Sequence, residues 1–267
     1  MDEQHTRWSA DMPDAYDRLL APAIFEPYAR DLAHRVAASS PARLVEIAAG
    51  TGIVTRALLD VPGVVDVVAT DLNPAMVELG RQRVPRASWE VADALTLPFE
   101  DCEFDAVVCQ FGVMFFPDKV AGMAQARRVL ADGGTFHANS WGALETHGIE
   151  VAYLRALKAV LNEEPPDFLA TVPHGYADPD RLASDARAAG FTSVRVDIVT
   201  LTNAAMTPRD AAVGYTTGTP MRAGLEAKGD LAALADAIAG EMERLLGADP
   251  VELPMTANVL TAAVQRA

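Results

Sequence analysis

The sequence predicts an α/β protein in which a doubly wound, mostly parallel sheet of seven strands is covered by helices. Short apolar runs alternate with stretches of helical periodicity from residue 41 onward, which is the pattern of consecutive strand–helix units. Most of these runs are apolar throughout, as expected of strands buried on both faces. With 267 residues and 50% hydrophobic composition, the chain can bury a sizeable core.

In the first half of the chain, predicted strands and helices alternate regularly. Residues 14–39 have apolar positions at helical spacing but contain Pro22 and Pro27, which predicts two short helices. Strands are predicted at 44–48, 64–69, 88–92, 104–109 and 135–139, with helices at 53–59, 76–83 and about 119–130. Asn73 before Pro74 favours a helix start there, and residues 132–134 (DGG) are expected to end the last of these helices.

The second half is less regular. Helices are predicted at 148–161 and 179–189, and strands at 193–201 and 255–264. The long segment between these two strands includes an amphipathic helix near 230–246, and we expect either a lid or a purely packing role for it. The expected organisation is an N-terminal helical cap (1–40), a cofactor-binding core (41–143), and a remainder with the helical lid (144–267) that belongs to the same domain.

Composition excludes several classes of function. The net charge of −15 disfavours binding to nucleic acid and to anionic membrane surfaces. The two cysteines, Cys102 and Cys109, have no metal-ligand spacing, so neither a disulfide framework nor a metal site is expected. The acidic N-terminus differs from a signal peptide, and no apolar run reaches a bilayer-spanning length. We therefore expect a cytoplasmic location.

The most informative loop follows the first predicted strand. Residues 44–52 read LVEIAAGTG, in which Gly50 and Gly52 let a ligand approach the backbone at a helix start. Nineteen residues after Gly52, the second strand ends in Asp71, a carboxylate placed to meet ribose hydroxyls. A tight turn without a ligand, and a helix-capping role for Asp71, are the alternatives.

Further loops end strands at the same edge, and together they resemble a known family. The motifs in chain order are EIAAGTG, ATDLNPAM, ADALTLPF, FDAVVCQFGVMFFPD and RRVLADGGTF. They resemble those of class I S-adenosylmethionine-dependent methyltransferases, in particular the small-molecule branch with the ubiquinone/menaquinone-biosynthesis enzymes. The resemblance is strong over about residues 40–142 and implies a Rossmann-like methyltransferase fold with S-adenosylmethionine as cofactor.

The resemblance implies roles for residues of the first loop. Glu46 would orient the methionine end of the cofactor, and Gly50 and Gly52 would line the loop that its backbone contacts. The family usually has glycine where this chain has Ala48, so this cofactor-binding loop is expected to be narrower.

For the nucleoside, the resemblance implies that Asp71 holds the ribose diol and that Leu72 and Met76 lie against the adenine. Asp93 would accept a hydrogen bond from the adenine amino group, with the backbone of Ala94 beside it.

The sequence says less about the residues that would surround the molecule receiving the methyl group. By the same resemblance, Gln110 and Phe111 would border the methionine moiety and the methyl-transfer position. Tyr16, Phe115 and Trp141 are candidates for an acceptor pocket, although aromatic residues at such positions also serve as core.

Histidine is the usual general base near neutral pH, and two histidines are candidates. His147 follows the fifth predicted strand, and His174 lies in a loop that could fold over the site. Either could instead be an ordinary polar side chain. His137 lies within a strand and is expected to be packed.

The predicted function is the transfer of a methyl group from S-adenosylmethionine to an oxygen or carbon of a small, partly apolar molecule. A sulfonium already carries a good leaving group, so alignment of the acceptor and exclusion of water are the main requirements. One alternative is a noncatalytic cofactor-binding or regulatory protein with the same fold. An NAD(P)-dependent oxidoreductase fits less well, because Thr55 replaces the third glycine and no Tyr-x-x-x-Lys pair is present.

Overall fold

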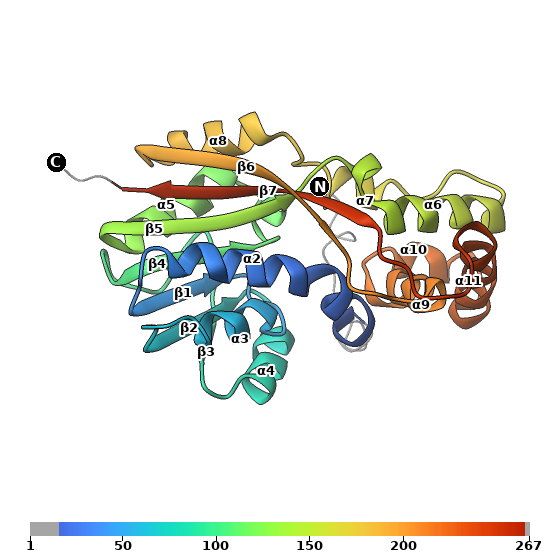
Figure 1. Cartoon of the computed structure of the whole chain (residues 1–267), viewed down its shortest axis with the longest axis horizontal. Coiled ribbons are helices and arrows are strands. Elements are labelled where there is room, and N and C mark those ends of the chain that lie inside the picture. Colours follow the sequence, from blue (N-terminus) through green and yellow to red (C-terminus); the bar gives the residue numbers. More distant parts are fainter. Residues whose placement is uncertain (1–15, 265–267) are drawn as a thin grey trace. The chain divides into compact units, whose positions relative to one another are not determined.

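The computed structural model describes residues 16–264, with side chains from residue 18 onward. Its strands form one seven-stranded sheet in the order β3-β2-β1-β4-β5-β7-β6 (Figure 1). Neighbours among β1 to β5 pair in parallel, whereas β7 pairs antiparallel with β5, so the mostly parallel sheet is confirmed. The strands are β1 (Arg43–Ile47), β2 (Asp66–Asp71), β3 (Ser88–Val91), β4 (Phe104–Gln110), β5 (Leu130–Trp141), β6 (Ser193–Thr202) and β7 (Pro254–Ala263).

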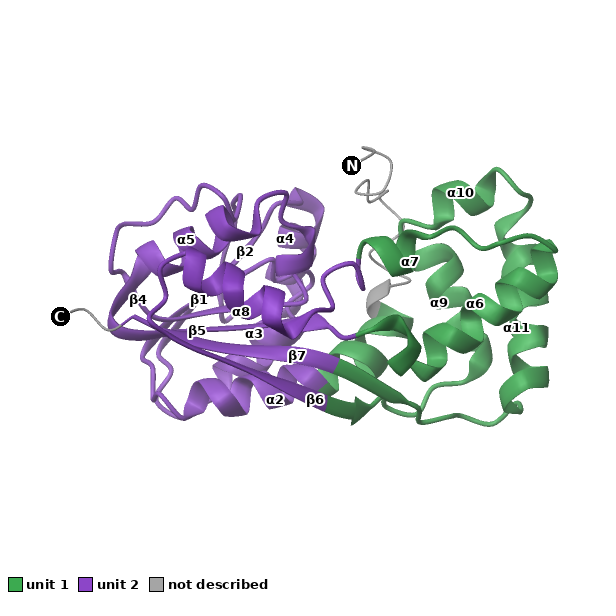
Figure 2. Ribbon diagram, turned by 90° about the horizontal axis from the view of Figure 1, so that it is seen from above, with its two compact units in different colours: residues 1–27, 143–172, 200–256 green, residues 28–142, 173–199, 257–267 purple. Residues whose placement is uncertain are grey.

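The chain divides into two compact units, coloured separately in Figure 2. Unit 2 comprises residues 28–142, 173–199 and 257–267, and contains most of the sheet with its flanking helices. Unit 1 comprises residues 1–27, 143–172 and 200–256, and is mainly helical.

Helices cover both faces of the sheet (Figure 1). They are α2 (Glu26–Ala37), α3 (Ile53–Leu59), α4 (Pro74–Arg83), the short 3-10 turn η3 (Val113–Phe115), α5 (Lys119–Val129) and α8 (Pro179–Ala188). The central strands β1 and β4 are buried along nearly their whole length, which explains why the sequence shows them as apolar runs without alternation.

Unit 1 is built around helices that pack closely on one another. They are the π-helical η2 (Tyr16–Phe25), the short η4 (Leu144–Thr146), α6 (Gly148–Leu161), α7 (Phe168–Thr171), α9 (Pro208–Gly218), α10 (Arg222–Glu226) and α11 (Leu231–Leu246). Gly214 brings α9 against η2, since a Cβ there would lie 2.7 Å from Leu20 Cδ2. Among the described residues of the chain, no helix has both the length and the apolar character required to cross a bilayer.

Most predicted elements occur within a residue or two of their expected ends, and the predicted helices at 53–59 and 148–161 match the structure. The expectation that residues 132–134 end a helix is wrong. Helix α5 ends at Val129, and β5 begins at once with Leu130 paired to Phe104. The register then shifts to Ala106 beside Thr135, so the DGG residues form an irregularity inside a longer strand. Gly133 permits it with φ +78°.

Candidate active site

The expected cofactor residues share one edge of the sheet. Strands β3, β2, β1 and β4 are consecutive parallel neighbours, so their carboxyl ends and the loops that follow them lie together. These loops all belong to unit 2. The sheet therefore brings together the cofactor residues that the sequence suggested, which are distributed over residues 46–111.

The loop after β1 turns sharply through left-handed backbone. Gly50 has φ +57°, and a Cβ at this residue would meet no atom within 4 Å, so its surface is open to a ligand. Gly52 has φ +92°, and a Cβ there would lie 2.9 Å from Val84 Cγ2 and 3.0 Å from the Trp89 ring. Gly50 thus offers an open backbone surface, whereas the absence of a side chain at Gly52 lets Val84 and Trp89 pack against the loop.

Ala48 also adopts left-handed backbone, with φ +56°. This conformation costs about 1–2 kcal/mol for a residue with a Cβ. The methyl group of Ala48 is accommodated by Gly112, where an added Cβ would lie only 2.7 Å from Ala48 Cβ. This chain has alanine where the family usually has glycine, and Gly112 on the neighbouring loop leaves the space that the extra methyl group needs.

Asp71, at the end of β2, is held by backbone N–H groups. Gly50 N–H donates to Oδ2 and Asn73 N–H donates to Oδ1, each at 2.9 Å. Burial raises the pKa of Asp71, and the N–H donors of Asn73 and Gly50 act in the opposite direction. A carboxylate oxygen can accept a second hydrogen bond, so Asp71 retains capacity for ribose hydroxyls. The helix cap is Asn73, whose side chain accepts from Ala75 N–H.

Glu46, in β1, is almost completely buried and accepts a 2.6 Å hydrogen bond from the Thr55 hydroxyl. Burial raises the pKa of Glu46 to about 8; the Thr55 hydrogen bond opposes the shift and the nearby Asp71 charge adds to it. Glu46 therefore holds a proton near neutral pH in this structure. Thr55, which stands where a dinucleotide motif would have its third glycine, connects α3 to this carboxyl group.

The expected adenine side combines an exposed and a buried apolar residue. Leu72 is 68% exposed, which is unusual for a large aliphatic side chain, whereas Met76 is buried. Asp93 is exposed, and its Oδ1 accepts from Leu95 N–H at 2.9 Å, while Ala94 is buried. An apolar surface beside a carboxylate with a remaining acceptor oxygen is suited to an adenine ring.

Sequence reasoning missed Arg128, at the end of α5, which fixes the loop carrying Asp93. Its guanidinium donates to the carbonyl oxygens of Phe99 and Leu97 at 2.7 and 2.8 Å and to the Asp101 carboxylate at 2.9 Å. A planar group with several donors suits this task. The only signal in the sequence was the RRVLADGG motif itself.

The turn after β4 is held by an aromatic cluster. Phe111 has φ +50°, and its ring stacks on Trp141 with 3.5 Å between centroids and 14° between planes. Tyr28 meets both rings edge-on, at 5.4 and 5.5 Å. Gln110, the last residue of β4, is buried beside this cluster. Tyr28 is fully buried and donates to Val199 O, so it is a core residue.

The candidate acceptor residues differ in position. Trp141 is buried in the cluster, and Phe115 is 39% exposed. The side chain of Tyr16 lies outside the described part of the structure. Phe116 packs on α5, where a Cβ on Gly122 would lie 2.5 Å from its ring.

His174 is buried near Trp141, with 6.4 Å between ring centroids. Its Nδ1 lies 2.7 Å from the carbonyl oxygen of Gly142. Because a carbonyl oxygen can only accept, Nδ1 carries the hydrogen, and the lone pair of the neutral ring is on Nε2. This is the tautomer that a base acting through Nε2 requires.

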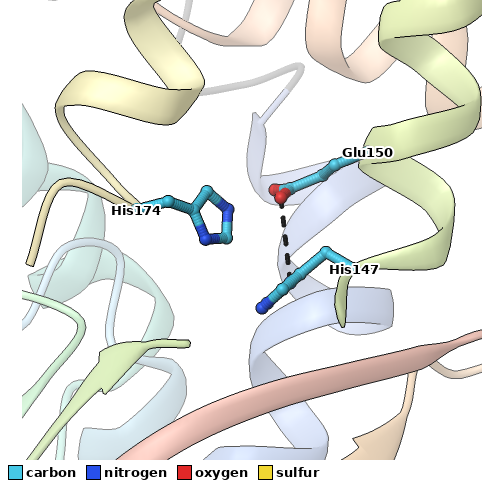
Figure 3. Close-up of side chains that lie close together, drawn as sticks. All are labelled: His147, Glu150 and His174. Atoms are coloured by element: carbon cyan, nitrogen blue, oxygen red, sulfur yellow. Dashed lines mark ion pairs between the residues drawn. The ribbon is translucent and has the colours of Figure 1, made fainter. Parts of the chain in front are cut away.

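His147 lies at the start of α6, in unit 1, and both of its ring nitrogens have contacts there. Nε2 is 2.9 Å from Thr256 O, closer than the 3.4 Å approach of Thr256 N, so Nε2 donates to the carbonyl. Nδ1 faces the Glu150 carboxyl group at 3.7 Å, the contact marked in Figure 3, which is an ion pair only when the His147 ring is protonated. Glu150 in turn accepts from Tyr215 at 3.0 Å. This buried network suits a structural role, and catalysis by His147 stays a prediction.

His137 is packed as the sequence indicated. It is 2% exposed, its Nε2 lies 3.0 Å from the Thr135 hydroxyl, and burial lowers its pKa to about 4. His137 is therefore neutral under ordinary conditions.

The fold and the strand-end loops define a Rossmann-like protein that binds a nucleoside cofactor of the methyltransferase kind. Three features fit S-adenosylmethionine: the open backbone at Gly50, the ribose-facing capacity of Asp71 and the exposed Leu72. Comparison with known proteins agrees, since a methyltransferase-domain family matches residues 44–134.

Curated relatives narrow the class. The chain is 30% identical over 191 residues to a demethylmenaquinone methyltransferase of Deinococcus radiodurans, covering 67% of this chain and 79% of the relative. It is 33% identical over 128 residues to the ubiquinone/menaquinone biosynthesis C-methyltransferase UbiE of Geobacter, covering 45% of this chain and 54% of the relative. The chain belongs to the class I S-adenosylmethionine-dependent methyltransferases, in the quinone-biosynthesis branch. It is an enzyme that uses S-adenosylmethionine. Neither a noncatalytic cofactor-binding protein nor an NAD(P)-dependent oxidoreductase is favoured.

Solved structures share the fold. A phosphoethanolamine N-methyltransferase of Haemonchus contortus, solved with S-adenosyl-L-methionine, aligns with a TM-score of 0.62 at 17% identity, covering 98% of this chain and 59% of that one. The YcgJ protein of Bacillus subtilis aligns with a TM-score of 0.57 at 17% identity, covering 88% and 98%.

Proposed function

We propose that this enzyme transfers the methyl group to an oxygen or a carbon of a small, partly apolar acceptor with a hydroxylated or quinone-type ring. The aromatic cluster of Phe111, Trp141 and Tyr28 carries the proposal, because it makes the region beside the expected methyl-transfer position apolar. Relatives named for demethylmenaquinone and for ubiquinone/menaquinone C-methylation support this acceptor class. The net charge of −15 supports a small molecule rather than a nucleic acid.

When bound, S-adenosylmethionine supplies a methyl group attached to a positively charged sulfur. The sulfur compound is a good leaving group when the methyl group is transferred. The chain's own residues have mainly to hold the reactants in line. In this proposal Asp71 accepts from the ribose hydroxyls, Leu72 and Met76 contact the adenine, and Asp93 accepts from its amino group.

At the methionine end, the Ala48–Gly52 loop supplies backbone contacts and Glu46 orients the amino-acid portion. Gln110 and Phe111 border the transfer position. Thr55 keeps the Glu46 carboxyl group in place through its hydrogen bond.

His174 is the proposed general base. Its Nδ1–H is held by the Gly142 carbonyl. In this proposal the Nε2 lone pair of that tautomer accepts the proton that the acceptor's hydroxyl loses. A deprotonated ring hydroxyl is a stronger nucleophile at its oxygen and at the adjacent ring carbon. His147 is the second candidate for this proton transfer.

The test uses S-adenosylmethionine with a tritium-labelled methyl group and a reduced, short-chain demethylmenaquinone. We expect label in the organic-extractable product, and none in RNA offered in a parallel reaction. Calorimetric binding of S-adenosylhomocysteine without label transfer to hydroxylated rings would refute the acceptor class. Binding of neither cofactor form to the folded protein would refute the cofactor site.

A further inference from the structure

Asn139 is a buried polar residue of β5 that the roles described above leave unassigned; it is 1% exposed. Its side-chain Oδ1 accepts from Phe111 N–H at 2.8 Å, and its own carbonyl oxygen lies 3.2 Å from the same nitrogen. A backbone N–H can only donate, so the side-chain atom facing it must be the oxygen. The amide is therefore oriented by the protein, with its NH₂ group directed away from Phe111 N.

The NH₂ group is the unmatched part of this side chain, and among the described residues His137 Nδ1, on the same strand, is unmatched as well. Within the part of the chain that the structure describes, Asn139 Nδ2 is buried and has no hydrogen-bond partner. Asn258, a similarly buried asparagine of β7, donates its Nδ2 to Ala177 O at 2.8 Å. Since buried polar atoms generally have partners, the unmatched donor of Asn139 calls for an explanation.

The position of Asn139 suggests the explanation. It pairs in register with Gln110 on the neighbouring parallel strand, so both side chains leave the same face of the sheet. Two residues further on, Trp141 leaves the same face and stacks on Phe111. The donor of Asn139 therefore lies in the layer of side chains that border the expected methyl-transfer position.

We propose that Asn139 is a two-sided ligand-binding residue. Its Oδ1 positions the turn at Gln110 and Phe111, and its Nδ2 donates a hydrogen bond to an anionic or carbonyl oxygen of the bound ligand. Both the cofactor's carboxylate and a hydroxylated or quinone-type acceptor offer such an oxygen. This inference rests on the function proposed above, and the experiment distinguishes the two sources.

Asn139→Asp is the decisive variant, with Asn258→Asp as a matched control for the same change in a neighbouring strand. At about pH 8 the introduced carboxylate keeps an acceptor for Phe111 N–H but removes the donor. Calorimetric titrations would use S-adenosylhomocysteine and 5′-methylthioadenosine, which lacks the amino-acid carboxylate. Turnover of reduced short-chain demethylmenaquinone would give its KM.

If the partner is the cofactor's carboxylate, Asn139→Asp weakens S-adenosylhomocysteine binding by about tenfold or more and leaves methylthioadenosine unchanged. If the partner is the acceptor's oxygen, both cofactor affinities stay unchanged and the KM of the acceptor rises by about tenfold. In either case the loss shrinks as the pH is lowered, because burial raises the pKa of the introduced carboxyl group and its protonated form donates again. Effects no larger than those of Asn258→Asp would overturn the proposal.

Wild-type protein provides a second measurement that does not require a folded variant. The side-chain amide signal of Asn139 in ¹⁵N spectra should move downfield when S-adenosylhomocysteine or the reduced demethylmenaquinone is added. An unmoved signal with both probes, in a sample where S-adenosylhomocysteine binds, contradicts the role of Asn139 alone. Absence of any binding to wild-type protein would instead contradict the proposed function.

Discussion

The cofactor side and the acceptor side of unit 2 are organised by contacts of different range. In the loops after β1 and β2, the polar contacts join residues within one strand–helix segment or its neighbour. Glu46 bonds to Thr55, nine residues away, and Asp71 bonds to Asn73, two residues away. Left-handed backbone at Gly50 completes the turn.

Around the ends of β4 and β5, the contacts join distant segments. Phe111 bonds to Asn139, 28 residues away, and His174 bonds to Gly142, 32 residues away. The comparison teaches that the loops after β1 and β2 include contacts of very short range, although Gly112 and Arg128 support the cofactor side from distant positions. The acceptor side, by contrast, exists only after the sheet and its aromatic cluster have assembled. Variants on the two sides should therefore fail in different ways.

The largest effect is expected on the acceptor side. His174→Asn retains a donor for the Gly142 carbonyl but has no basic nitrogen. Methyl transfer to a hydroxylated ring should fall by about 10²–10⁴-fold. S-adenosylhomocysteine affinity, measured by calorimetry, should not change, and neither should the thermal midpoint. A transfer rate equal to that of the wild type would show that His174 is not the base.

On the cofactor side, Gly52→Ala should mainly reduce stability. Its Cβ would approach Val84 and Trp89 at about 3 Å in a left-handed backbone. Overpacking and the backbone conformation together should lower the free energy of unfolding by about 2–5 kcal/mol, measured in urea. Gly50→Ala, where the space is open, is the matched control and should cost about 1–2 kcal/mol. Equal costs at the two glycines would contradict the distinction between them.

Asp71→Ala should weaken S-adenosylhomocysteine binding by about 1–3 kcal/mol, the range for removing a charged hydrogen-bonding partner. Calorimetry measures the change. Asp66→Ala, at the other end of β2, removes the same charge away from the site and serves as the control. Unchanged affinity in Asp71→Ala would mean that the ribose is held elsewhere.

Glu46→Gln should flatten the dependence of stability on pH. Because burial raises the pKa of Glu46 from 4.5 to about 8, the folded state holds an extra proton between these values. Its stabilising contribution is complete below the lower value and is lost as pH rises through the upper one, with a slope of at most about 1.4 kcal/mol per pH unit. Urea unfolding at several pH values measures the slope, with Glu90→Gln as an exposed control. Parallel curves for wild type and Glu46→Gln would contradict this prediction.

Ala48→Gly should have the smallest effect. It relieves the left-handed strain at φ +56° but gives the unfolded chain more freedom and removes the methyl group beside Gly112. We expect the free energy of unfolding to change by less than about 1 kcal/mol, with cofactor affinity preserved. A large loss of stability would show that the methyl group is an essential part of the packing.

Local patterns predicted the sheet and the strand-end loops in which the expected cofactor residues lie. Each of these patterns acts within a few residues, because turn conformation and helix capping are local properties. Examples are the apolar runs, the glycines at 50 and 52, and the Asn73-Pro74 helix start. The helix boundary at 129–135 was mispredicted because β5 begins through pairing with Phe104, a contact that no local pattern contains.

By itself the sequence determined the fold class and the mostly parallel direction of the strands. Through the family that its motifs resemble, it also indicated the cofactor. Tertiary structure alone decided that Arg128 fixes the loop of Asp93, that Gly112 makes room for Ala48, and that Asn139 orients Phe111. Each of these contacts joins residues more than about twenty-five positions apart. Such contacts depend on side-chain direction and strand register, which only the assembled sheet defines.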